Sequence, residues 1–218
     1  MPFEDKPLKE FELCPDGLHR MRLVWLVDLG THVDVWEGVS KDQKKILLGF
    51  ELIDTAMKDG RPFLVSKEYN VSPSQFGGYY ASKTSNLFSL AKTMMKADDK
   101  EASRIGTIGK NMGALGQILL SHNETTNKEG LKRTYVKIDA IQPLAKSKEK
   151  DAPEARNPIV NYQIGDEFPE TLPEWIAKKI AASQEMTVTK TNDVSDATPE
   201  AVASPKPTVT LTDAEIPF

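Results

Sequence analysis

Arginine, tyrosine and lysine alternate near the start of the segment LKRTYVKIDAIQPL, residues 131–144. Because successive side chains of a β-strand point to opposite faces, Arg133, Tyr135 and Lys137 should share one face. Cations neutralise phosphates, and aromatic rings stack on unpaired bases at about 1–3 kcal/mol per base. The alternation therefore predicts a surface for single-stranded nucleic acid, although a cross-strand pair would also account for Tyr135.

Further cations and aromatic rings occur in the same part of the chain. Residues 61–150 hold 15 Lys/Arg against 8 Asp/Glu, whereas the whole chain has a net charge of −4. A basic middle between acidic ends favours an anion-binding surface. The full set of predicted contacts is Arg20, Arg22, Trp36, Lys67, Tyr69, Tyr79, Tyr80, Lys83, Arg133, Tyr135 and Lys137.

A second interpretation is a metal-dependent nuclease. Asp28, Asp34, Glu37 and Glu51 are oxygen ligands of the kind that hold Mg²⁺ at such sites. Asp34 and Glu37 also lie near an expected bend, where solvated acids are ordinary. The sequence favours binding over catalysis, so we expect no metal site.

Other catalytic motifs are absent from the sequence. GTIGKN, residues 106–111, lacks the G-x-x-x-x-G-K-[ST] spacing of a phosphate-binding loop. His19, His32 and His122 have no zinc-ligand spacing, and Cys14 has no C-x-x-C partner. We therefore expect a protein that needs no cofactor and is not an enzyme.

Five segments have the alternation or composition of strands. The first is expected to bend or bulge at Gly30, and the segment 82–97 has the apolar spacing of a helix. The predicted strands cover residues 18–30 (continued or followed by 31–38), 44–54, 61–71, 114–123 and 131–144. The residues expected on one face of the first strand are Met21, Leu23, Trp25, Val27 and Leu29.

The order of these elements is three strands, a helix and two strands. It predicts a mainly β fold, the five-stranded OB-fold Greek-key barrel with a helix between strands 3 and 4, a fold that binds oligonucleotides. Another small β-rich barrel or sandwich with one helix has the same order. Residues 1–145 are assigned to this DNA-binding domain.

The rest of the chain divides into two parts. Residues 146–183 are predicted to be a charged linker followed by a short helix, 171–183, that packs on the barrel. Thr171 and Glu174 have the spacing of a capping box at its start. Residues 184–218 are rich in Thr, Pro, Ala and Ser and are predicted to form a disordered acidic tail.

The composition of the chain bears on its expected cellular location. Its 218 residues fit one domain with appendages, and its single cysteine cannot staple a fold, which favours a reducing cytosol. The N-terminus has no signal-peptide pattern, and no apolar run is long enough for a membrane span. A homodimer is left open, since edge strands or the helix 171–183 can each pair two copies.

Ordered phrases along residues 15–186 resemble a family of bacteriophage single-stranded DNA-binding proteins with an OB-fold. The phrases are RLVWLVDLGTH, KKILLGFELID, RPFLVSKEYNVS, SNLFSLAKTM, GALGQILLSHN, YVKIDAIQPL and LPEWIAKKIAASQE. Members commonly carry a Trp-Arg-rich segment after the helix, where this chain has KADDKEASRIG, so no contact is carried over to residues 96–106. The resemblance implies a location in the cytoplasm of an infected bacterium.

The last residues resemble the acidic tip of bacterial single-stranded DNA-binding proteins, which ends in Asp-Asp-Asp-Ile-Pro-Phe. The matching residues here are Asp213, Glu215, Ile216, Pro217 and Phe218, with Ala214 interrupting the acids. A ring at such a tip fills an apolar pocket of a partner, and proline lowers the ordering cost. We therefore expect it to recruit replication, recombination or repair proteins.

Together these observations predict a non-enzymatic protein that coats single-stranded DNA without strong sequence preference. It would protect exposed DNA during phage replication and recombination. Two alternatives stay open at this stage: a metal-dependent phage nuclease, and an adaptor whose barrel binds only protein.

Overall fold

Two long strands form the centre of the fold, β1 (Gly17–Trp36) and β2 (Val39–Ala56). The computed structural model describes residues 12–74, 78–126, 130 and 132–187. β1 and β2 pair antiparallel through a tight turn at Glu37 and Gly38, both at positive φ. The sheet has seven strands, and its main path runs β4-β3-β2-β1-β5-β6. The remaining strands are β3 (Pro62–Pro73), β4 (Tyr79–Tyr80), β5 (Leu115–Thr126), β6 (Lys132–Pro143) and β7 (Val160–Tyr162).

β1 changes partner along its length. It pairs antiparallel with β5 up to Arg22 and then parallel with β7 from Trp25, and a β-bulge lies between Leu23 and Trp25. A bulge shifts the following side chains to the other face of the sheet. The prediction of one shared buried face was therefore wrong: Met21 and Leu23 belong to one core, and Trp25, Val27 and Leu29 to the other. The bend expected at Gly30 is confirmed, with a second register shift and a φ of 86°.

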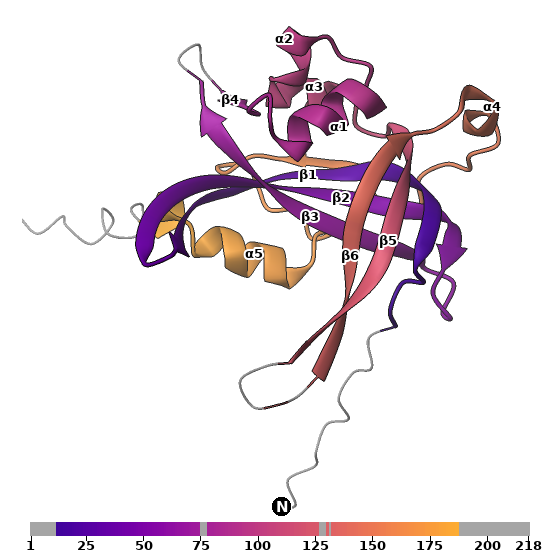
Figure 1. The fold of residues 1–218 in the computed structure, drawn as a ribbon, viewed down its shortest axis with the longest axis horizontal. Helices are drawn as coiled ribbons and strands as arrows, with labels where there is room; N and C mark the ends of the chain where they lie inside the picture. Colours follow the sequence, from indigo (N-terminus) through magenta and orange to yellow (C-terminus); the bar gives the residue numbers. More distant parts are fainter. Residues whose placement is uncertain (1–11, 75–77, 127–129, 131, 188–218) are drawn as a thin grey trace, which may run out of the picture.

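Both faces of this sheet are covered by helices (Figure 1). On one side lie α1 (Asn86–Met94), α2 (Asp99–Ala102) and α3 (Ile105–Lys110), and on the other lies α5 (Glu174–Ala181). A single turn, α4 (Lys146–Glu149), follows β6. The middle parts of the central strands, residues 21–29 and 46–53, are mostly apolar, as expected where both faces are buried.

The sheet is open, so the predicted mainly β body is confirmed while its closure into a barrel is not seen. β3 and β6 lie at opposite ends of the five long strands, and α1 packs between them, with Lys67 Nζ donating to the Ile138 carbonyl at 3.4 Å. The five predicted strands are all present. The short strands β4 and β7 and the helices α2, α3 and α4 were not predicted.

The helices α1 and α5 begin in different ways. α1 begins after Ser85, whose hydroxyl accepts a bond from the Phe88 amide, so it is shorter than the predicted 82–97. α5 begins after Pro173 without a side-chain cap, so the predicted capping box at Thr171 is not formed. Its Ile176 and Ile180 are buried against β1.

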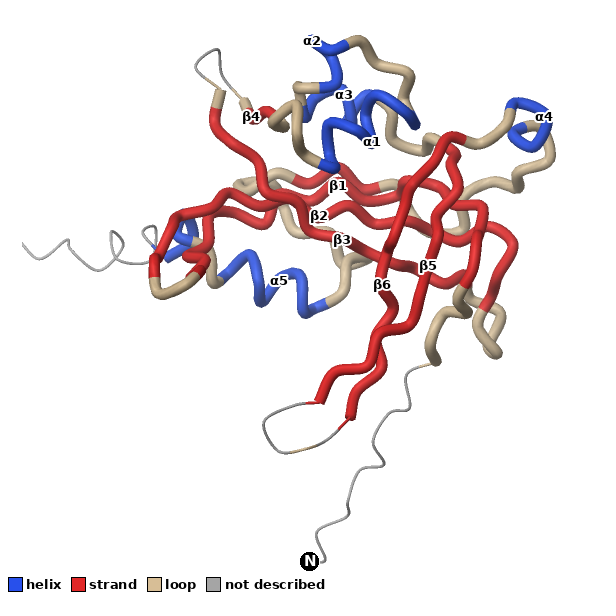
Figure 2. The backbone as a smooth tube through the Cα atoms, in the orientation of Figure 1, coloured by secondary structure: helices blue, strands red, loops and turns tan. Residues whose placement is uncertain are grey.

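The segments after β6 lie along the sheet. Residues 150–159 form the loop that follows α4 (Figure 2), and Glu51 of β2 accepts bonds from the Arg156 and Asn157 amides. Glu185 lies beyond the predicted boundary at 183 and is bound to Thr31 and Lys44. Among the helices described, none is long and apolar enough to cross a membrane. Asp213, Glu215, Ile216, Pro217 and Phe218 lie outside the described residues.

Candidate nucleic-acid interface

The outer face of β6 carries the cation–aromatic–cation row. Arg133, Tyr135 and Lys137 are exposed, with 44% of Tyr135 accessible, while Ile138 on the other face is buried. Asn123 Nδ2 on β5 donates to the Tyr135 hydroxyl at 3.4 Å. Lys137 pairs with Asp139 at 2.8 Å, and this hydrogen bond raises the pKa of Lys137.

This row lies on a hairpin that leaves the body of the protein. β5 and β6 cross the end of the sheet and continue beyond it as a two-stranded arm (Figure 2). Residues Lys132–Tyr135 and their partners on β5 belong to that outer part. The exposed side of Tyr135 therefore lies on this arm.

A second group of predicted contacts borders the opening of the sheet. Lys67 and Tyr69 of β3 line a cavity of about 200 Å³ between β3, α1 and β6. Lys67 Nζ lies 5.8 Å from the centre of the Tyr69 ring. Tyr69 is only 8% exposed, and burial raises the pKa of its hydroxyl. Its ring faces the core and offers little area to a base, whereas Lys67 is half-buried at the mouth.

A third group forms a larger groove between β4 and the helices α2 and α3. Tyr79 and Tyr80 line this cavity of about 920 Å³, and 41% of Tyr80 is exposed. Lys100, Arg104 and Lys110 face it as well, against one acid, Glu101. Tyr80 pairs with Arg104 in an isolated antiparallel bridge. We refer to this cavity as the Tyr79–Tyr80 groove.

The three cations of this groove were missed at the sequence level. The segment 96–106 was set aside because it departs from the Trp-Arg-rich pattern of the family it resembles. Arg104 and Lys110 become neighbours of the tyrosines only through the bridge between β4 and the start of α3. The basic balance of residues 61–150 was the signal that could have found them.

The remaining predicted contacts lie elsewhere. Arg20 donates to Asp54 at 2.6 Å, and Arg22 is buried and donates to the Pro153 carbonyl, so both arginines serve the fold. Trp36 is 77% exposed at the tip of the β1–β2 hairpin. Lys83 is exposed before α1 and lines neither of these two cavities.

Three of the four acids of the nuclease interpretation are bound by separate partners, and the fourth, Glu37, is exposed in the turn between β1 and β2. Asp28 pairs with Lys44 at 2.9 Å, and Asp34 pairs with Lys45 at 2.6 Å. Glu51 is 2% exposed and bound to backbone amides. Within the described residues, no group of three or more His, Cys, Asp or Glu side chains is arranged to hold a metal ion.

Cys14 and His122 are neighbours without forming a nucleophile and its base. His122 Nε2 bonds to the Cys14 backbone carbonyl at 2.7 Å rather than to the thiol. Burial raises the pKa of the Cys14 thiol to about 11, which keeps it protonated at neutral pH.

Comparison with known proteins gives no assignment: no protein-family model matches the sequence, and no curated protein matches it.

Proposed function

We propose that this protein binds single-stranded DNA without sequence preference. The observation that carries the proposal is the exposed row of Arg133, Tyr135 and Lys137 on the projecting β5–β6 hairpin. A ring between two cations supplies stacking and phosphate neutralisation at adjacent positions, which is the chemistry of non-specific single-strand binding. The Tyr79–Tyr80 groove repeats this combination on the body of the protein.

We propose that the body is an OB-type fold opened between β3 and β6. OB-folds are five-stranded, partly open barrels that bind oligonucleotides across their strands and loops. The long strands here follow the order β3-β2-β1-β5-β6, with α1 in the opening. In this proposal the β5–β6 hairpin is the loop arm that closes over bound DNA.

Binding should depend steeply on salt. Each phosphate neutralised on a single strand contributes about 0.7 to the slope of log K against log salt. We expect the variant Arg133→Ala/Tyr135→Ala/Lys137→Ala to bind a labelled poly-dT oligonucleotide about tenfold more weakly at low salt. Its slope should fall by about 1.4, because two cations are lost. Fluorescence anisotropy across a salt series measures both quantities.

The matched control is Lys132→Ala. Lys132 is exposed on the same strand but on the opposite face, where it pairs with Glu124 at 3.8 Å. This variant should bind poly-dT within about twofold of the unmodified protein. Equal affinity of the triple variant and the unmodified protein would remove the hairpin from the interface.

The same assay separates the rival functions. A protein-only adaptor would bind neither poly-dT nor duplex DNA at low salt. A nuclease would shorten the labelled strand when Mg²⁺ or Mn²⁺ is added, and Asp28→Asn would stop the cleavage. A preference for poly-dT over duplex without cleavage is the result expected here.

We further propose that the segment ending in Ile216, Pro217 and Phe218 recruits replication, recombination or repair proteins. The support is the resemblance of these residues to the tip of bacterial single-stranded DNA-binding proteins. A chain truncated before residue 210 should keep its affinity for poly-dT and lose those partners. Loss of DNA binding with partners retained would reverse this assignment.

A further inference from the structure

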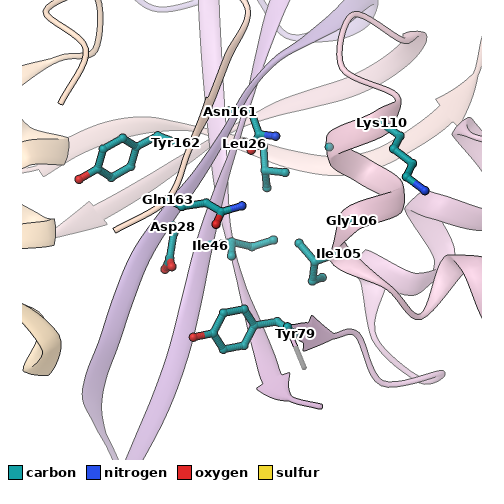
Figure 3. Close-up of a pocket in the computed structure, with 12 residues that line it drawn as sticks. Leu26, Asp28, Ile46, Tyr79, Ile105, Gly106, Lys110, Asn161, Tyr162 and Gln163 are labelled. Carbon is teal, nitrogen blue, oxygen red and sulfur yellow. The ribbon is translucent and has the colours of Figure 1, made fainter. Parts of the chain in front are cut away.

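A separate cavity of about 460 Å³ lies between β1, β7 and α3 (Figure 3). Its apolar wall comes from Leu26, Ile46 and Ile105, and Tyr79 closes one side. Asn161 of β7 and Gln163, which follows β7, both line it. Tyr162 between them also borders it, but its ring points away and packs on Phe168. The cavity thus has apolar walls and two amide groups at its edge.

The charges around this cavity are arranged to disfavour an anion inside it. Asp28 lines it, and Lys44 is held by Asp28 and Glu185, each at 2.9 Å, with its Nζ 4.9 Å from the Tyr79 ring centre. Burial opposes the charge on Lys44, but these hydrogen bonds raise its pKa and keep it cationic. A phosphate would meet the Asp28 carboxylate, whereas an amino group would find an acceptor there.

The glycines of GTIGKN give this cavity its space. Gly106 and Gly109 line it from one side of α3. A Cβ at Gly106 would meet no atom within 4 Å, and a Cβ at Gly109 would approach Asn161 Nδ2 at 3.1 Å. The motif that lacked phosphate-loop spacing therefore shapes a cavity in place of wrapping a phosphate.

The cavity opens beside the Tyr79–Tyr80 groove, since Gly78, Tyr79, Gly106 and Lys110 line both. Lys110 lies at the rim with its side chain pointing away from the centre of the cavity (Figure 3). A phosphate on the rim can meet Lys110, while a flat ring attached to it enters between apolar walls. Amide groups and a carboxylate at the inner edge complement the donors and acceptors of a base.

We propose that this cavity is a base pocket, which takes one unpaired nucleobase from a single strand lying in the Tyr79–Tyr80 groove. The inference rests on the proposed function for the strand and adds where a base is held. The same base and phosphate also occur in a free nucleoside monophosphate. The experiments must therefore distinguish a free nucleotide from a nucleotide within a strand. The pocket can contribute only when a base is present, whereas the hairpin cations can also bind the phosphates of an abasic strand.

The proposal can be tested by a substitution at Gly106 that fills the cavity. Gly106→Leu places a side chain in the open space, and glycine is the poorer helix former, so α3 should not be destabilised. Gly106→Ala is the matched control, because a Cβ alone meets nothing. We expect Gly106→Leu to weaken binding to poly-dT about tenfold and Gly106→Ala to leave it within about twofold.

An abasic strand of equal length separates pocket filling from general damage. Gly106 also borders the groove, so the added side chain can touch the strand itself. Binding to the abasic strand should nevertheless fall much less for Gly106→Leu than binding to poly-dT, because no base enters the pocket. Equal poly-dT affinity of the two proteins, or equal losses on both strands, would overturn the base pocket. Neither result would affect the proposed function, which the hairpin variant tests.

Calorimetric titration with free nucleoside monophosphates tests whether the cavity binds a free nucleotide instead of a base within a strand. Tight binding of a monophosphate that Gly106→Leu abolishes, with no binding of poly-dT, would assign the cavity to free nucleotides and refute single-strand binding. Absence of binding to both probes would overturn both proposals.

Discussion

Glu51 shows how one buried carboxylate holds a charged segment on the sheet. It is 2% exposed and accepts from the Asn157 amide at 2.6 Å, from Asn157 Nδ2 at 2.7 Å and from the Arg156 amide at 3.1 Å. A buried acid is tolerated where donors satisfy its oxygens. The segment predicted as a charged linker is therefore fixed to β2 at this point.

We predict that Glu51→Gln lowers the free energy of unfolding by about 1–3 kcal/mol, because an amide NH₂ replaces an oxygen that accepts hydrogen bonds. Urea unfolding followed by tryptophan fluorescence measures the loss. Glu154→Gln, an exposed acid in the same segment, should change stability by less than about 0.5 kcal/mol. Similar values for the two variants would show that the Glu51 contacts do not stabilise the fold.

At the scale of the elements, the pairing of β1 with β2 depends on the fit between Trp25 and Gly49. The two residues are paired across the strands, and the buried indole covers the glycine. A Cβ at Gly49 would lie 2.6 Å from the Trp25 ring, closer than real contacts allow. Residue 49 must therefore be glycine, because the Trp25 ring occupies the place of any Cβ.

Gly49→Ala should destabilise the protein by about 1–3 kcal/mol, since an added methyl group in a packed core forces side chains from their preferred positions. Thermal unfolding measures the effect as a lower Tm. Gly106→Ala, the same change in open space on a helix, should leave Tm unchanged or raise it. An unchanged Tm for Gly49→Ala would mean that the Trp25 indole moves aside without cost, and that Gly49 is not required there.

Local patterns predicted the five long strands and the exposed face of β6, because alternation is a property of the strand itself. The bulge after Leu23 left no local signal, since its cause is the change of partner from β5 to β7. The burial of Tyr69 likewise depends on α1 filling the space between β3 and β6. The groove cations Arg104 and Lys110 were missed for the same reason, since only tertiary contacts bring them to Tyr80.

At the scale of the whole molecule, the segment after α5 packs back onto the two long strands β1 and β2. Glu185 accepts from the Thr31 amide and hydroxyl, both at 2.8 Å, and pairs with Lys44 at 2.9 Å. Just before it, Ser183 packs against Gly30 so closely that a Cβ at Gly30 would lie 2.3 Å from the Ser183 Cβ. This anchor shares Lys44 with Asp28 and Tyr79, so it joins the C-terminal segment to the wall of the proposed base pocket.

The anchor should weaken in acid. Burial raises the pKa of Glu185, but hydrogen bonds from Thr31 and Lys44 outweigh it and lower that pKa from 4.5 to about 2. A carboxyl whose pKa is depressed by folding stabilises the native state above its ordinary pKa, and the contribution is lost as pH falls toward the folded value. The stability that Glu185 confers should therefore be complete above about pH 5 and disappear near pH 2.

Urea unfolding of Glu185→Gln and of the unmodified protein, compared from neutral pH to pH 2, measures this contribution. Other acids with lowered pKa values, such as Asp54, titrate in both proteins, so only the difference between the two curves reports on Glu185. We expect the difference to be largest at neutral pH and to shrink below pH 4.5, while Glu167→Gln, an exposed acid, shows no such trend. A difference that stays constant with pH would mean that the charge of Glu185 does not hold the C-terminal segment, and that packing of Ser183 on Gly30 does so instead.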